Sequence, residues 1–398
     1  MKVLFCAVDP SAEERHAAGQ LLRALGPNCE CKLLHLQGTP GWRGVESIFT
    51  MGEAQAFDPD LVHPVDHQGQ IVLLESWRDS KSLLCRTQLS TMLDERVSFG
   101  LDLLANAGVA TVPYRLLANS NDLLAFRNMP GNEEWRLHPE HLRDPSHPAR
   151  VALRELYGET LHMVVFVSDN RPVKDEEGED SLLPPLVLQP VVGVLQRGGV
   201  QDLRGLGGVF VDGPVARALA KKVRLAAQVC GIRGAVQVQL EMGSDGKALA
   251  RSLRLAAPPD LLPLLFQSGL VQDSADTLFR RMLKDKPVRL KKSQEIHWAL
   301  RIYDHLQTES RHLEGVPGVS TVPQAGYFGE QSEGAAVQLL LSDLLGWLTM
   351  RDGQEIPEAL WEVCPTAQVR QGLARERAAL LEKIAKFELE VVTDGDKP

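Results

Sequence analysis

The sequence has no run of about 20 apolar residues, the length that a membrane-spanning helix needs. It also has no stripe of basic residues, because 43 Lys and Arg stand against 52 Asp and Glu, for a formal net charge of −9. Nucleic-acid backbones are bound by clustered positive charge. The first residues, MKVLFCAVDPSAEERHAAG, lack the long apolar run and small-residue cleavage site of a signal peptide. We therefore expect neither a membrane nor a nucleic acid as partner.

Cysteines are few, and the six present are scattered along the chain. Only Cys29 and Cys31 stand close together, and no second pair matches them. This pattern predicts buried, reduced thiols and a cytoplasmic location rather than a zinc site. His138, His141 and His147 form a small cluster, but their spacings of three and six match no common zinc pattern.

Common catalytic motifs are missing as well. The first strand-to-helix turn lacks the G-x-G-x-x-G fingerprint of dinucleotide binding, and G-x-S-x-G, C-x-x-C and H-E-x-x-H do not occur. One stretch is rich in glycine, at positions 198, 199, 205, 207 and 208. It does not end in the G-K-S/T of a phosphate-binding loop, so we interpret these glycines as part of an ordinary loop.

Apolar runs alternate with a helical pattern at the start of the chain. KVLFCAV, CKLLHL and QIVLLES have the composition of buried strands, and AEERHAAGQLLRAL has the apolar stripe of a helix. This alternation favours a parallel sheet covered by helices. We assign an N-terminal α/β domain to residues 1–115, a reduced lid-like part to 116–200, a core to 201–290, and C-terminal strands with a long helix to 291–398.

The later segments predict further strands and helices. HMVVFVS, PLVLQPVVGVL and HWALRIYDHL have strand composition, and VARALAKKVRLAAQVCG has apolar residues every three or four positions, as a helix does. DLLPLLFQSGL and DSADTLFRRMLKDKP also predict helices. AQVRQGLARERAALLEKIAKFELEVV predicts a long terminal helix, whose apolar positions 369, 373, 380, 384 and 387 we expect to pack on the body of the protein.

The segment LAAQVCGIRGAVQVQLEMGSDGKALARSLRLAAPPDLLPLLFQSGL combines a helix, a glycine, two strands joined by Gly-Ser-Asp-Gly, and an apolar helix. In this order it resembles the C-terminal half of an ATP-grasp domain, as in phosphoribosylamine–glycine ligase and the large subunit of carbamoyl-phosphate synthase. MLDERVSFGLDLLANAGVATVPYRLLANSNDLLAF is similar to the family's segment before the nucleotide site, and LVLQPVVGVL to the strand that lines its adenine pocket. The likeness covers roughly residues 70–285.

The resemblance implies a mixed α/β fold of ATP-grasp type. It would have an N-terminal parallel α/β lobe, a small lid lobe, and a C-terminal antiparallel sheet with helices. It also implies a chemistry in which ATP and magnesium activate a carboxylate for attack by an amine, so that the protein mainly positions the reactants and neutralises charge.

On this alignment the metal site falls on the hairpin, and two of its expected ligands are replaced. Gln239 corresponds to the first-strand ligand, and Arg254 to the arginine of the family's Glu-x-Asn-x-Arg pattern. The Glu of that pattern falls on Ala250 and the Asn on Ser252. Alanine has no ligand atom and serine is a poor neutral one, so the resemblance implies a weakened magnesium site. From the residues alone, Gln239 is also consistent with a solvent-facing position and Arg254 with a surface ion pair.

Other positions of the nucleotide site also differ from the family. The lid lysine corresponds to His138, and the acidic residue of the adenine strand to Pro190, with Gln189 beside it. Proline offers neither a carboxylate nor an N–H to the adenine. The acidic run EEGED stands where the family has a glycine-rich loop, and it would repel a phosphate. Glu241 becomes a metal ligand only if the strand register differs from this alignment.

Our leading hypothesis is a catalytically degenerate ATP-grasp-like protein that binds a small ligand or a protein partner and needs no cofactor. The alternative is an active ATP-dependent carboxylate–amine ligase. It would use ATP and Mg²⁺, with metal ligands relocated to Gln239 and Glu241, Arg254 in catalysis, and His138, Gln189 and Gln239 at the nucleotide. A third hypothesis is a structural subunit whose terminal helix, about residues 366–390, docks on a partner or a second copy. The sequence leaves a homodimer open.

Overall fold

The structure is a computed structural model. It describes residues 1–8, 29–35, 45–66, 96–142, 146–167, 184–192, 196–197, 200–201, 204–230, 234–243, 247–254, 295–303, 315–321, 344–357 and 366–394, with single residues at 18, 22, 25, 69, 93, 144, 261, 264, 265 and 270. The predicted strand QIVLLES, the acidic run EEGED and most of the two helices predicted between 260 and 287 lie outside the described residues.

The N-terminal part is a four-stranded parallel sheet in the order β3-β2-β1-β4, as the alternating pattern predicts. Helix α2 has a capping box in which Thr50 and Glu53 exchange hydrogen bonds. Two short strands, β3 and β4, were not predicted from the sequence. The bounds are β1 Lys2–Ala7, β2 Glu30–His35, β3 Glu46–Ile48, α2 Met51–Phe57 and β4 Leu61–Pro64.

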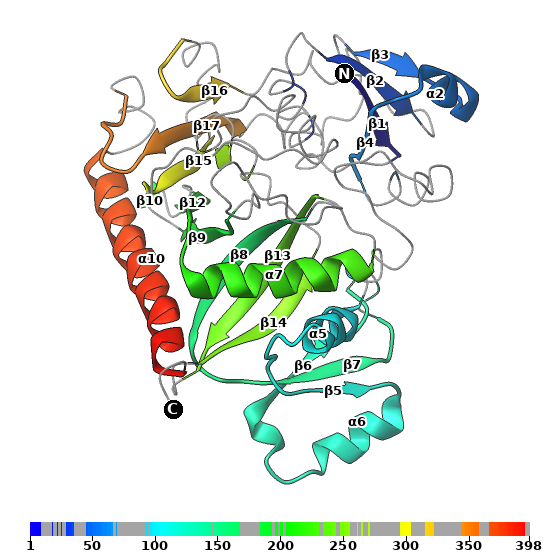
Figure 1. Ribbon diagram of the computed structural model, residues 1–398, viewed down its shortest axis with the longest axis vertical. Coiled ribbons are helices and arrows are strands. Elements are labelled where there is room, and N and C mark those ends of the chain that lie inside the picture. Colours follow the sequence, from blue (N-terminus) through cyan, green and yellow to red (C-terminus); the bar gives the residue numbers. More distant parts are fainter. Residues whose placement is uncertain are drawn as a thin grey trace.

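An antiparallel sheet of eight strands forms the centre of the molecule, in the order β14-β13-β8-β9-β12-β15-β17-β16 (Figure 1). It takes strands from all three of the sequence ranges predicted after residue 115. The bounds are β8 Glu159–Val167, β9 Leu186–Val192, β12 Arg204–Phe210, β13 Gly234–Met242, β14 Ala248–Arg254, β15 His297–Tyr303, β16 Val319–Thr321 and β17 Leu344–Arg351, beside a separate small hairpin of β10 Gln196–Arg197 and β11 Val200–Gln201.

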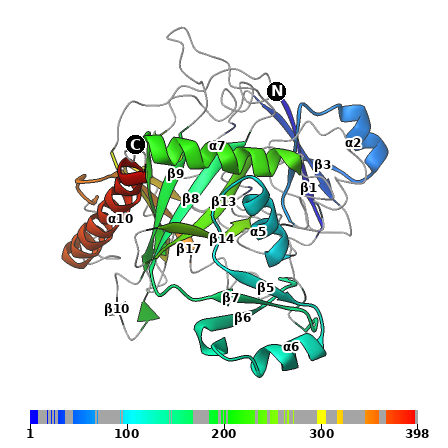
Figure 2. The ribbon, with the colours of Figure 1, turned by 60° about the horizontal axis from the view of Figure 1, so that its bottom comes forward.

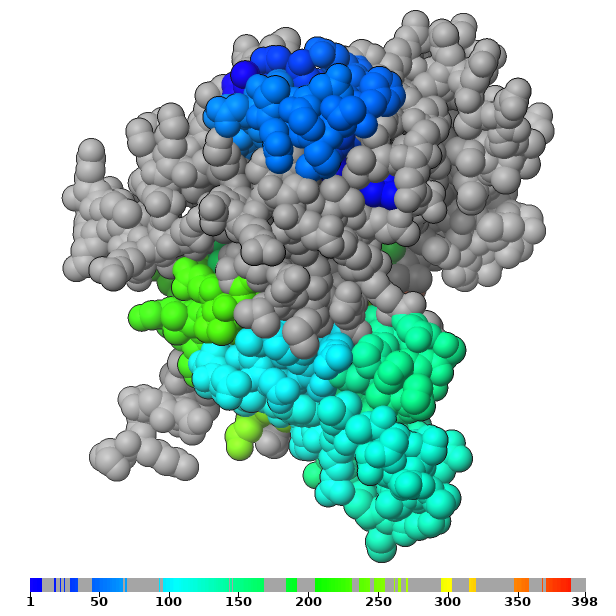
Figure 3. Space-filling view, turned by 90° about the vertical axis from the view of Figure 1, so that its right-hand side faces the viewer, coloured from blue at the N-terminus to red at the C-terminus, as the bar shows by residue number. Residues whose placement is uncertain are grey.

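A second, three-stranded antiparallel sheet forms the lid, in the order β5-β7-β6. Helix α6 covers one of its faces, where Leu117, Phe126 and Ala152 share a small core. The space-filling view shows the lid projecting from the body at the end opposite the N-terminal sheet (Figure 3). The bounds are β5 Tyr114–Leu117, α6 Ser120–Arg127, the 3₁₀ turn η1 Asn132–Glu134, β6 Trp135–Pro139 and β7 Arg150–Arg154.

Three helices cover one face of the eight-stranded sheet, α5 Val97–Asn106, α7 Pro214–Val229 and α10 Thr366–Asp394 (Figure 2). The predicted packing of the terminal helix is confirmed, because Leu373, Leu380 and Phe387 are buried in the core beneath it. Among the described residues, no helix combines the length and the apolar composition of a membrane span.

The opposite face of the sheet is buried at its centre. Val164, Leu186 and Leu206 from β8, β9 and β12 share a core with Val3 and Phe5 of the N-terminal sheet. The lid sheet instead stands at the β13–β14 end, where Leu249 packs beside the lid core of Val151 and Leu153. The lid sheet therefore packs against the β13–β14 end of the central sheet.

Three of the five glycines predicted to form a loop, Gly205, Gly207 and Gly208, lie in strand β12 instead, and positions 198 and 199 lie outside the described residues. A Cβ at Gly207 would lie 2.2 Å from Cζ3 of Trp298, and one at Gly205 would lie 2.1 Å from the carbonyl oxygen of Ala299. Trp298 on the neighbouring strand β15 is fully buried. Glycine is therefore required in β12 because the indole ring and the backbone of β15 approach it closely.

Candidate functional site

The hairpin of β13 and β14 separates its side chains onto two faces. On β13, Val238 and Leu240 belong to the core under the helices, so Gln237, Gln239 and Glu241 lie on the opposite face, toward the lid. Gln239 is directly opposite Ser252 of β14. Two neutral polar side chains therefore form the cross-strand pair at the position where the sequence predicts a metal site.

Ala250 does not belong to this site. Its side chain is fully buried in the core with Leu253, and the pairing of the two strands is irregular after Gln239. In a regular strand, side chains on the same face are an even number of residues apart. Ala250 and Leu253 are three residues apart and both face the core, so β14 contains a bulge that changes which residues face which side of the sheet. Ala250, which the resemblance aligns with a metal-binding Glu, therefore faces the core, whereas Ser252 faces the same side as Gln239.

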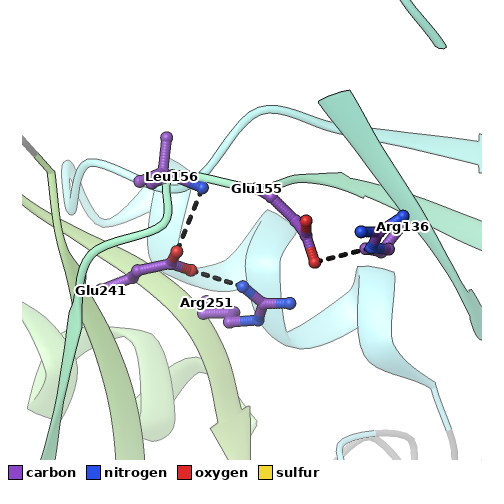
Figure 4. A network of polar contacts seen from close by, with 5 residues as sticks. All are labelled: Arg136, Glu155, Leu156, Glu241 and Arg251. Carbon is purple, nitrogen blue, oxygen red and sulfur yellow. Dashed lines mark hydrogen bonds and ion pairs between the residues drawn. The ribbon is translucent and has the colours of Figure 1, made fainter. Parts of the chain in front are cut away.

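Glu241 lies in a buried ion pair on the lid-facing side of the sheet. It is 4% exposed, and its Oε1 accepts a hydrogen bond of 3.1 Å from the backbone N–H of Leu156, where β7 of the lid ends. Its Oε2 accepts from Nη1 of Arg251 at 2.5 Å. Figure 4 shows the carboxylate held between these two donors. Both oxygens therefore face positively polarised N–H groups.

The lid adds a second ion pair and a histidine to the same region. Nε of Arg136 donates to Oε1 of Glu155 at 2.9 Å (Figure 4). Burial lowers the pKa of His138, and the positive charge of Arg251 lowers it further, with Glu155 opposing and Arg254 adding to the effect. His138 Nε2 and Glu155 Oε2 are both shielded from solvent and have no hydrogen-bond partner among the described residues.

Arg254 is exposed at the end of β14, opposite Gln237. Gln237 Nε2 lies 3.0 Å from Nδ1 of His162 on β8. Burial lowers the pKa of His162, and the charge of Lys383 lowers it further. Both effects favour the neutral form of the His162 imidazole beside the hairpin.

Gln189 lies on the other face of the sheet, away from the hairpin site. Its Nε2 donates to Glu376 at 2.7 Å and its Oε1 accepts from Lys383 at 3.0 Å, and both partners belong to α10. Pro190 follows it and pairs with Leu206 of β12, beyond the end of the β8–β9 pairing. The structure thus uses Gln189 to attach the terminal helix to the sheet.

The structure therefore brings together four of the predicted residues on the side between hairpin and lid, namely His138, Gln239, Glu241 and Arg254. Three further residues were missed: Arg136, Glu155 and Arg251. Arg251 could have been found from the sequence, because a charged residue in the interior of a half-buried strand predicts a buried partner. The other two lie on the lid, whose position over the hairpin is not readable from local patterns.

Neither protein-family models nor curated proteins match this chain. Solved structures do. The phosphoribosylaminoimidazole carboxylase ATPase subunit from Aquifex aeolicus matches with a TM-score of 0.55 at 11% identity, over 96% of this chain and 100% of its own. Phosphoribosylamine–glycine ligase from Thermotoga maritima matches with a TM-score of 0.54 at 11% identity, over 92% and 97%.

A third match, N5-carboxyaminoimidazole synthase from Aspergillus clavatus, has a TM-score of 0.54 at 14% identity, over 93% of this chain and 98% of its own. That structure is a complex with ADP and 5-aminoimidazole ribonucleotide, so these comparisons do not support the expectation that this chain needs no cofactor. At such identities the likeness concerns the fold. The TM-scores and the almost complete overlap with these structures identify this chain as a protein of the ATP-grasp fold.

Proposed function

We propose that this chain is a catalytically degenerate protein of the ATP-grasp fold, which binds a ligand between the hairpin and the lid. The observation that supports the proposal is the Glu241–Arg251 pair, because it holds a guanidinium on the same hairpin that the resemblance aligns with the metal site. Beside this pair, Gln239 and Ser252 are neutral. An exposed arginine, Arg254, and two buried polar atoms without a partner among the described residues, His138 Nε2 and Glu155 Oε2, support the proposal.

The residues of this site do not fit a magnesium ion. Magnesium prefers oxygen ligands, with carboxylates supplying negative charge. Glu241 is the carboxylate of β13, and Arg251 neutralises its charge. Within the described part of the chain, no group of three or more His, Cys, Asp or Glu side chains is arranged to hold a metal ion. A cation would also meet the charge of the guanidinium at close range.

The proposal is tested by titration calorimetry with a non-hydrolysable ATP analogue, with and without magnesium, together with an assay of ADP release in the presence of mixed carboxylates and amines. We expect no magnesium-dependent binding and no ADP release. Magnesium-dependent binding in the micromolar range with turnover would instead support an active carboxylate–amine ligase. In that case Gln239→Ala and Arg254→Ala should abolish turnover. Arg217→Ala, which removes an ion pair between α7 and the preceding Asp212, should not.

A further inference from the structure

Three sulfur-bearing side chains lie on one face of the N-terminal sheet. Strands β1 and β2 run side by side and parallel, with Lys2 opposite Glu30 (Figure 1). Continuing this register by one residue sets Met1 opposite Cys29, and the Glu30 N–H donates to the Met1 carbonyl oxygen at 2.9 Å. Met1, Cys29 and Cys31 all pack against the core that this sheet shares with the central sheet. Their sulfur atoms therefore gather at one edge of that core.

The charged residues next to these sulfur atoms belong to the opposite face of the sheet. Lys2 and Lys32 place Nζ over the ring of Phe57 in α2, at 5.3 and 5.0 Å from its centroid. Glu30, between the two cysteines, is exposed. Side chains alternate between the two faces of a strand. The face that carries the three sulfur atoms is therefore the one turned away from α2.

The two cysteine thiols are reduced, close together and partly exposed to solvent. The Cys31 thiol donates a weak hydrogen bond to the carbonyl oxygen of Cys29, with 3.8 Å between sulfur and oxygen. Burial, with a smaller contribution from the neighbouring Cys29 thiol, raises the pKa of Cys31 to about 12. At neutral pH the Cys31 thiol is therefore protonated, and a ligand of its sulfur must displace that proton.

The spacing of the two cysteines suits a bridging ion better than a disulfide. Residues two positions apart in an extended strand have Cα atoms about 6.6 Å apart. This is close to the upper limit of about 6.8 Å for a disulfide, whose sulfur atoms must come within about 2.05 Å of each other. A metal ion between two thiolates allows the sulfur atoms to stay up to about 4.6 Å apart, since each bond is about 2.3 Å long.

The donor atoms indicate which metal fits. Structural zinc sites take four ligands. Within the part of the chain that the structure describes, no third His, Cys, Asp or Glu completes this pair of cysteines into a metal-binding group. The thioether of Met1 is the additional donor, on a flexible side chain. Thiolate and thioether sulfurs are soft ligands, the type that selects monovalent copper.

We propose that Met1, Cys29 and Cys31 bind one copper(I) ion at this edge of the N-terminal sheet. Each cysteine loses its thiol proton to solvent and forms a copper–sulfur bond. The thioether of Met1 adds a third, neutral ligand, and the oxidation state of copper does not change. The inference goes beyond the proposed function and does not depend on it, because none of the three residues belongs to the β13–β14 hairpin or to the lid.

The test is an anaerobic titration of the full, reduced chain with copper(I), in competition with the coloured chelator bicinchoninate. We expect the protein to take one equivalent of copper from the chelator. Cys29→Ala and Cys31→Ala should each weaken the affinity roughly a hundredfold or more, because loss of an outer partner alone costs about 10–100-fold and here a ligand is lost. Cys6→Ala is the matched control. It changes a cysteine on the opposite face of the same sheet, and it should bind copper as the unchanged protein does.

Two further measurements distinguish this site from an ordinary pair of neighbouring thiols. In selenomethionine-labelled protein, X-ray absorption at the copper edge should show selenium bound beside two sulfur atoms. In urea, where the strands no longer hold Met1 opposite Cys29, the copper affinity should fall about tenfold or more. The inference is wrong if copper is held equally well in urea, if its shell contains no selenium, or if Cys6→Ala weakens binding as much as Cys29→Ala does.

Discussion

Replacing Glu241 with glutamine keeps the shape of the side chain but replaces one hydrogen-bond acceptor with a donor. Both carboxylate oxygens accept hydrogen bonds, one from the Leu156 N–H and one from Arg251. An amide has one oxygen and one NH₂ group, so in either orientation a donor faces a donor. The two side chains of the pair are only 6% and 19% exposed, so water cannot fully compensate.

The expected loss follows from these contacts. Exchanging a charged hydrogen bond for a neutral one and leaving one buried donor unmatched should together cost about 2–4 kcal/mol of unfolding free energy. In the double variant Glu241→Gln/Arg251→Gln, the second amide can turn to meet the first. The double variant should therefore lose clearly less than the sum of the single variants, with a coupling of roughly 1–3 kcal/mol.

The assay combines urea unfolding with hydrogen exchange at the Leu156 amide, which reports the junction of lid and sheet directly. Glu241→Gln should speed that exchange. Glu159→Gln is the control, since its pair with Lys386 lies on the surface, both side chains being nearly half exposed, and no measurable loss is expected. Additive single variants, or unchanged exchange at Leu156, would refute the conclusion that this pair connects the lid to the hairpin.

Three further predictions concern the fold. Gly207→Ala should destabilise the protein by about 3 kcal/mol, because its Cβ meets a buried indole ring, whereas Gly52→Ala in α2, with open space around it, should be neutral or stabilising in the same denaturation series. Leu380→Ala, at a fully buried position, should cost about 2–5 kcal/mol, whereas its exposed neighbour Leu381→Ala should change the urea midpoint little. His138 has a lowered pKa in the fold, so the unfolded chain binds its proton more readily and stability should decline as pH falls below the usual value of 6.5. His138→Asn should flatten this decline between pH 7 and pH 5, and an unchanged slope would contradict the buried position of the ring.

Periodic patterns in the sequence predicted much of the fold. The parallel N-terminal strands, helix α7 and the packing of α10 through Leu380 and Phe387 follow from apolar spacing, which records the face that each element buries. These features depend on a few residues close together in the chain, and so they can be read locally.

The candidate site was predicted only in part, because its geometry depends on irregular and distant contacts. One extra residue in the bulge of β14 moved Ala250 into the core and left Ser252 opposite Gln239. Simple alternation cannot foresee this shift, because the phase changes inside the strand. Gly205 and Gly207 of β12 are explained by Ala299 and Trp298 of β15, about ninety residues further along the chain. Gln189 has a still more distant partner, Glu376 of α10, 187 positions along the chain.

The position of α10 has a consequence for the order in which the chain can be completed. The lid takes its strands from one continuous stretch, residues 114–154, so its two hairpin-like pairings can close while later residues are still being synthesised. The central core cannot, because Leu380 and Phe387 fill it from the last of the described elements, and Gln189 bonds to a residue 187 positions away. Until α10 has been synthesised and has packed on the sheet, β9 and the neighbouring helix α7 expose apolar surface. A chain cut short before α10 would therefore present a finished lid on an open, aggregation-prone sheet.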